Sequence, residues 1–230
     1  MPGPTDHPAA AGRRATAAYI APFLVYIALM TIEHALNLPL RIFYPIRCAV
    51  SLAILLTVSR PVLSFRPSRP LATIALGAAV FLIWIAPDFL FGYRHFWLFE
   101  NSVLGAAATS LPPDLRASPA FLAVRALGST LLVPVLEEFF WRAWMMRWLI
   151  DTSFLKVPLG AYRPSAFWLV AVLFAFEHGP YWEVGLAAGI LYNWWMVHTR
   201  SLADCVLAHT ITNGLLSVFV LGAQQWQYWL

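Results

Sequence analysis

Residues 131–149 read LLVPVLEEFFWRAWMMRWL and place three charged side chains, Glu137, Glu138 and Arg142, in the middle of an apolar, aromatic run. The run is long enough to cross a bilayer as a helix. A carboxylate within the hydrocarbon costs about 3 kcal/mol or more, so it is rare there unless it has a function. At helical spacing Glu138 and Arg142 lie one turn apart on one face, whereas Glu137 lies roughly 100° around the helix. The sequence therefore predicts that Glu138 pairs with Arg142 and that Glu137 points elsewhere.

The rest of the chain is as apolar as this run. Of its 230 residues 60% are hydrophobic and 11% are charged, and the mean hydropathy is +0.69. Soluble domains carry about 25% charged residues, so the composition predicts an integral membrane protein. The net charge of +4 does not indicate nucleic-acid binding, because the basic residues lie in short loops between apolar runs. Cys48 and Cys205 lie in apolar segments, so neither a disulfide framework nor a cysteine-based zinc site is predicted.

Seven apolar segments can be drawn, each near the roughly 20 residues that a span needs. They are residues 17–37, 42–59, 70–91, 119–150, 164–179, 183–199 and 201–223. We expect a single all-α domain over residues 1–230, a polytopic transmembrane bundle of about seven to eight helices, with a flexible tail at 1–16. The first segment is expected to be a retained anchor, because it is longer than the apolar part of a cleavable signal. The fourth segment contains Pro134, which predicts a kink or a protruding end.

Basic residues in the loops predict the orientation in the membrane. With the N-terminus inside, the inner loops collect Arg13, Arg14, Arg60, Arg66, Arg69, Arg147, Lys156, Arg163 and Arg200. The outer loops collect only Arg41, Arg94 and Arg116. Since cytoplasmic loops are enriched in Lys and Arg, a cytoplasmic N-terminus is expected, with the loop at 92–118 outside.

Two further polar motifs have helical spacing. Phe174 and His178 lie one turn apart near the end of the fifth segment, and His209 and Asn213 lie one turn apart in the last. Depth can be measured from the inner loops at about 1.5 Å per residue. The diacid, Glu137 and Glu138, and His178 then lie roughly 20 Å deep, and His209 lies about 12 Å deep. We therefore expect these groups to meet inside the bundle.

These residue types suit hydrolysis by water. A glutamate removed from bulk water can act as a general base that takes a proton from a water molecule, and a nearby histidine can later protonate the leaving amine. The His209/Asn213 pair offers N–H donors where an oxyanion develops. Two alternatives remain open: a metalloprotease with Glu137, His178 and His209 as zinc ligands, and a transporter or assembly partner that uses the polar core without catalysis.

In chain order, the three motifs resemble those of the CAAX protease and bacteriocin-processing family, which are glutamate-dependent intramembrane proteases. The resemblance covers residues 119–223. It implies that Glu137 activates water with His178 as its partner, and that His209 and Asn213 stabilise the oxyanion. Supporting roles then fall to the remaining polar and aromatic members of the motifs, Glu138, Arg142, Phe174 and Glu177.

Three longer stretches of sequence indicate a particular branch of this family. VPLGAYRPSAFW (157–168), LYNWWMVHTRSL (191–202) and AHTITNGLL (208–216) resemble the CAAX-protease-related branch found beside exosortases in bacteria. This branch implies an endopeptidase of the bacterial inner membrane that acts on a membrane-associated protein, with exosortase-system components as possible partners. No cofactor is expected, and zinc is the alternative. Glu177 adds a third acid beside His178, which leaves open which acid carries the negative charge.

Overall fold

The computed structural model describes residues 8–109 and 111–229, and its architecture is a bundle of helices. Within those ranges no strand occurs, so the all-α prediction is confirmed. The helices are α1 (Pro8–Ala35), α2 (Leu40–Thr57), α3 (Pro70–Phe91), α4 (Pro113–Arg116), α5 (Pro119–Leu127), α6 (Val133–Glu138), α7 (Met146–Trp148), α8 (Pro164–Phe176), α9 (Trp182–Thr199) and α10 (Leu202–Ala223). Their bounds agree with the seven predicted segments to within a few residues, except that α1 begins earlier.

Five of the described helical stretches are long and apolar enough to cross a membrane. They are Gly12–Ala35, Leu40–Thr57, Pro70–Phe91, Pro119–Trp148 and Leu202–Ala223. The chain is therefore an integral membrane protein, as its composition predicted. The helix Pro164–Phe176 is apolar but shorter than a full span, which agrees with the short fifth segment.

The first helix corrects one expectation. It begins at Pro8, so residues 8–16 are helical and do not belong to the flexible tail that was predicted for 1–16. Residues 1–7 lie outside the described part of the chain. The physical reason is composition: the stretch from Pro8 is rich in alanine, a strong helix former, and contains only one glycine.

Several helices begin at a proline, and α3 ends at a residue with a positive φ. Pro70, Pro119 and Pro164 each occupy the first turn of a helix, where the missing N–H costs nothing. Gly92 ends α3 with φ 58°, a left-handed conformation that glycine adopts without strain.

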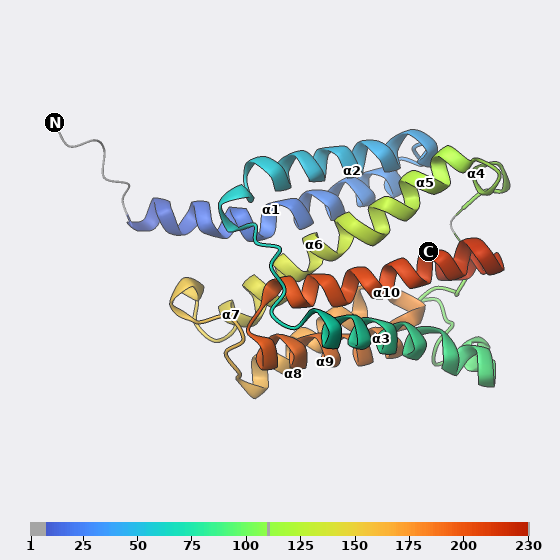
Figure 1. The fold of residues 1–230 in the computed structure, drawn as a ribbon. Helices are drawn as coiled ribbons and strands as arrows, with labels where there is room; N and C mark the ends of the chain where they lie inside the picture. Colours follow the sequence, from blue (N-terminus) through green and yellow to red (C-terminus); the bar gives the residue numbers. More distant parts are fainter. Residues whose placement is uncertain (1–7, 110, 230) are drawn as a thin grey trace.

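Helix α10 lies at the centre of the bundle, between α6 and α3 (Figure 1). Its contact with α3 is close, because a Cβ added at Gly77 would lie 2.5 Å from the carbonyl oxygen of Ala208. Helices α1 and α2 form a neighbouring pair, and α8 packs on α9. The centre of the bundle therefore receives side chains from α6, α9 and α10.

A buried carboxylate fixes the start of α10 to the loop before α3. Asp204 is fully buried. Its Oδ2 accepts hydrogen bonds from the backbone N–H and the hydroxyl of Ser68, each at 2.7 Å. Its Oδ1 accepts from the Arg69 N–H at 3.0 Å and from the Thr73 hydroxyl at 2.7 Å. Four donors on one carboxylate hold α3 and α10 in register.

Replacing Asp204 should therefore destabilise the bundle. Asp204→Asn places an NH₂ group against donors and removes the charge, so at least one donor is left buried without an acceptor. The expected loss is about 1–3 kcal/mol of unfolding free energy, measured as a lower melting temperature in detergent. Asp151→Asn is the control, because Asp151 is exposed and, among residues 8–109 and 111–229, accepts a hydrogen bond only from the Ser153 N–H. Equal melting temperatures for both variants would contradict this account.

The antiparallel course of the helices collects their connecting loops at two ends. The loops after α2, α7 and α9 lie at the end where α1 begins (Figure 1). This end carries the nine basic residues that the sequence assigns to the cytoplasm. Reporter fusions after Arg66 and after Lys156 should therefore report cytoplasmic, and a fusion near residue 105 should report outside. The reverse pattern would refute the orientation.

Candidate active site

Two π-helical turns flank the diacid. Residues Gly128–Leu132 and Phe139–Met145 are π-helical, and α6 between them carries Glu137 and Glu138. Pro134 lacks an N–H and its ring would collide with the carbonyl four residues earlier in a regular α-helix. The preceding wider turn avoids this collision, so the irregularity expected at Pro134 takes the form of a π turn. Such turns are frequent at functional sites.

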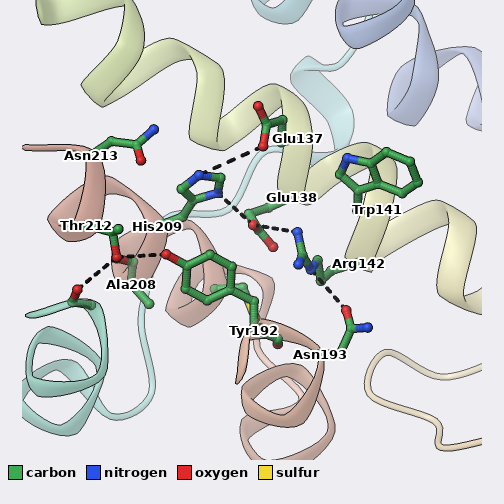
Figure 2. A network of polar contacts seen from close by, with 12 residues as sticks. Glu137, Glu138, Trp141, Arg142, Tyr192, Asn193, Ala208, His209, Thr212 and Asn213 are labelled. Atoms are coloured by element: carbon green, nitrogen blue, oxygen red, sulfur yellow. Dashed lines mark hydrogen bonds and ion pairs between the residues drawn. The ribbon is translucent and has the colours of Figure 1, made fainter. Parts of the chain in front are cut away.

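Glu138 is the centre of a buried ion-pair network (Figure 2). Its Oε1 accepts a hydrogen bond from Arg142 Nη1 at 3.0 Å and another from His209 Nδ1 at 2.8 Å. Glu138 and Arg142 are both fully buried. The predicted Glu138–Arg142 pair is thus confirmed, and the network also reaches α10. A buried pair with this geometry is costly to break.

The guanidinium group of Arg142 is enclosed by aromatic rings and an amide. Its Cζ lies 4.2 Å from the centroid of the Phe174 ring and 5.3 Å from that of Tyr192. Its Nε donates to the side-chain oxygen of Asn193 at 3.2 Å. Phe174 therefore supports the arginine through its ring face, a contact favourable to a desolvated cation.

Glu137 points away from Arg142 and towards the other nitrogen of His209 (Figure 2). Its Oε2 lies 3.8 Å from His209 Nε2 and makes no hydrogen bond within the described chain. Both side chains line a cavity of about 670 Å³, together with His178 and Asn213. The four residues that the resemblance singled out thus share one cavity, reached from α6, α10 and the end of α8.

His178 is held at the cavity wall by its own helix. Its Nδ1 donates to the Phe174 carbonyl at 2.7 Å, which leaves Nε2 as the nitrogen that can exchange a proton. The edge of Trp84 packs on its ring at 5.1 Å. A Cβ added at Gly185 would lie 3.2 Å from the imidazole, so α9 confines the ring from another side.

Asn213 and Glu177 complete the polar wall of the cavity. The Asn213 amide donates to the Ser129 carbonyl at 2.9 Å, which orients the side chain. Glu177 is exposed, and its Oε2 accepts a hydrogen bond from the indole of Trp141 at 2.9 Å. Trp141 therefore fixes the position of this third acid.

Sequence reasoning missed the residues of α9 that support the site. Tyr192 stacks on the His209 ring, with centroids 5.0 Å apart. Its hydroxyl donates to Thr212 at 2.7 Å, and Thr212 donates to the Gly77 carbonyl at 2.8 Å. Neither Tyr192 nor Asn193 stood out, because a tyrosine or asparagine in an apolar helix has no distinctive pattern. Both residues are far from Arg142 and His209 in sequence or on a different helix, so their contacts with them arise only in the folded chain.

The described residues contain no group of three His, Cys, Asp or Glu side chains arranged to hold a metal ion. Glu137 and His209 form a pair, with the carboxylate Oε2 3.8 Å from the imidazole Nε2. A catalytic zinc site uses three protein ligands and keeps a fourth position open for water.

Part of the chain, including the region of this cavity, matches a known protein family. Residues 119–215 match the family described as Type II CAAX prenyl endopeptidase Rce1-like. No curated protein and no solved structure matches the chain. The matched region contains Glu137, His178, His209 and Asn213 together with the ion-pair network. The predicted resemblance to CAAX proteases is therefore confirmed over residues 119–215, as a match to the Rce1-like type II CAAX prenyl endopeptidase family.

Proposed function

We propose that this protein is an intramembrane endopeptidase in which Glu137 activates a water molecule for attack on a peptide bond. The observation that carries the proposal is the cavity itself. It brings the Glu137 carboxylate, the His209 imidazole, His178 and Asn213 to one space inside an apolar bundle. A general base, a proton donor and N–H donors beside one space are the groups that hydrolysis requires.

The roles divide according to what each side chain contacts. Glu137, whose Oε2 makes no hydrogen bond to the described protein, takes the proton from water. His178, whose Nδ1 donates to the Phe174 carbonyl, accepts that proton at Nε2 and passes it to the leaving amine. Asn213 and His209 stabilise the oxyanion, His209 through Nε2 when that nitrogen carries a proton. Glu138 orients His209 by accepting from Nδ1.

The apolar bundle strengthens these contacts. Fixed dipoles and charges act more strongly where bulk water is excluded, because the local dielectric constant is low. Glu138, Asn193 and two aromatic rings already hold Arg142 in place. The charged groups around the cavity therefore do not have to move during the reaction. Preorganisation of this kind lowers the barrier of the chemical step.

The substrate proposed here is a membrane-associated protein, since a cavity within the bundle is reached most directly from the bilayer. The stretches at 157–168, 191–202 and 208–216 support a link to a bacterial exosortase-type sorting system in the inner membrane. The N-terminus is proposed to be cytoplasmic, on the basis of the loop charges.

The diacid can be separated into a base and a scaffold by matched substitutions. Glu137→Gln keeps the size of the side chain but removes the proton acceptor, so cleavage of a co-expressed substrate should fall by about 10²–10⁴ with little change in melting temperature. Glu138→Gln leaves Arg142 without its charged partner, which should cost about 3–5 kcal/mol and lower both yield and melting temperature.

The two variants serve as controls for each other. A destabilised Glu137→Gln beside a stable, inactive Glu138→Gln would exchange the two roles. Two stable and fully active variants would remove the diacid from the reaction.

Chelation tests the metal alternative. Because the proposed nucleophile is water activated by a carboxylate, the purified protein should keep its cleavage rate after treatment with a strong zinc chelator. Loss of activity upon chelation, with recovery upon addition of zinc, would favour the metalloprotease.

A further inference from the structure

His178 lies in a short turn between two helices. Helix α8 ends at Phe176, and α9 begins at Trp182. Between them His178 has φ −93° and ψ 6°, and the 3₁₀ turn Gly179–Tyr181 follows it. The direction in which the imidazole points therefore depends on what packs against this turn.

A segment that precedes the family match packs against the turn. The indole N–H of Trp182 donates to the Leu98 carbonyl at 3.3 Å. A Cβ added at Gly179 would lie 3.2 Å from the Leu104 carbonyl oxygen, so the two backbones are in close contact. Residues 92–104 lie before the matched residues 119–215, so the family match does not account for these contacts.

Arg94 joins this segment to three other parts of the bundle. The residue is buried, with only 2% of its surface exposed. Its Nη1 donates to the Pro180 carbonyl at 2.9 Å and lies 2.9 Å from Glu183 Oε1. Its Nε lies 3.3 Å from Asp88 Oδ2, near the end of α3. One guanidinium group thus connects α3, the turn that follows His178, and the first turn of α9.

Aromatic rings connect Arg94 to the imidazole by a second route. The Cζ atom of Arg94 lies 4.1 Å from the centroid of Tyr181. The Tyr181 ring stacks on Trp84, with centroids 6.3 Å apart and planes at 18°. The edge of Trp84 packs on the His178 ring at 5.1 Å. Since Trp84 and Asp88 lie one turn apart on α3, the ion pair of Arg94 with Asp88 also restrains Trp84.

The bond to the carbonyl distinguishes positioning from neutralisation of charge. A pair with either acid would neutralise the arginine, whereas the bond to Pro180 restrains the backbone two residues after His178. The guanidinium can serve a carbonyl and two carboxylates together, because its N–H donors point in fixed directions in one plane. Charge-assisted bonds of this kind are about twice as strong as neutral ones. The contacts of Arg94 are therefore suited to holding the turn in one conformation.

We propose that Arg94 is a positioning residue, which holds the turn between α8 and α9 so that the imidazole of His178 faces the cavity beside Glu137. Arg94 is not among the residues that line the cavity, so it acts through His178. Its effect on the reaction rests on the proposed function, in which His178 transfers the proton. The placement of the imidazole, by contrast, can be measured without a substrate.

The first test observes the imidazole itself. Solid-state NMR of the full-length protein in lipid, with isotopically labelled histidine and at alkaline pH, distinguishes the Nδ1–H tautomer from the Nε2–H tautomer. The His178→Gln variant assigns the signal. We expect only the Nδ1–H tautomer of His178 in the unaltered protein, since the Phe174 carbonyl accepts from Nδ1. Loss of Arg94 should add the Nε2–H tautomer, because a turn that is no longer held lets the ring leave this carbonyl.

Two variants that differ only at residue 94 provide the comparison. Glu183→Gln is the matched control, and Arg94→Gln/Glu183→Gln also lacks the guanidinium group. The double variant keeps the net charge of the cluster, because it removes one positive and one negative group together. The remaining acid, Asp88, still accepts a hydrogen bond from the Tyr228 hydroxyl. The double variant should therefore fold with a melting temperature close to that of the control, while the control alone keeps the single tautomer.

Kinetics then connects the imidazole to the reaction. Cleavage of an internally quenched peptide of alanine and leucine is followed in the same lipid. Because a displacement of about 1 Å can cost about 100-fold in rate, the kcat of the double variant should be about 10- to 100-fold below that of Glu183→Gln. KM should change by less than about threefold, since a residue outside the cavity does not contact the peptide.

The outcomes separate this inference from the proposed function. A single Nδ1–H tautomer in the folded double variant overturns the inference, as does a fall in kcat without any change at His178. A displaced His178 with unchanged kcat supports the role of Arg94 in placement and contradicts the proton transfer assigned to His178. Absence of cleavage by the unaltered protein contradicts the proposed function, while the tautomers of the two variants still decide whether Arg94 places the imidazole.

Discussion

The structure depends on how one buried carboxylate, Glu138, is neutralised within an apolar bundle. The Glu138 oxygen that accepts from Arg142 also accepts from His209, so a single atom joins the diacid helix to α10. Without these partners the carboxylate would be too costly to bury. Because Arg142 pairs with Glu138, the Glu137 carboxylate faces the cavity instead. The different roles of Glu137 and Glu138 thus follow from the free-energy cost of burying a charge.

The backbone around the diacid is adapted to this arrangement. The π turns at Gly128–Leu132 and Phe139–Met145 change the direction of successive side chains relative to a regular helix. Glycines then let neighbouring helices approach: Gly77 brings α3 against α10, and Gly185 brings α9 against His178. The polar groups of three helices consequently face one cavity.

The fold was predictable because each apolar segment has the length that a bilayer demands, and charges and prolines mark the ends of several segments. The Glu138–Arg142 pair was predictable for the same reason as any i, i+4 pair. The π turns were not, since their hydrogen bonding depends on packing around Pro134. The link from Glu138 to His209 spans 71 residues, and the stacking of Tyr192 on His209 depends on the approach of α9 to α10. Neither contact can be predicted from the pattern of neighbouring residues in the sequence.

The central claim is that Glu137 positions the attacking water in this cavity. An experimental structure of the Glu137→Gln variant with an uncleaved peptide tests it most directly, because the substitution keeps the shape of the site while preventing hydrolysis. The account predicts the scissile carbonyl beside residue 137 with one water between them, and the carbonyl oxygen directed towards His209 and Asn213. A peptide bound away from this wall, or a metal ion held by His178 and His209 in the position of the water, would contradict it.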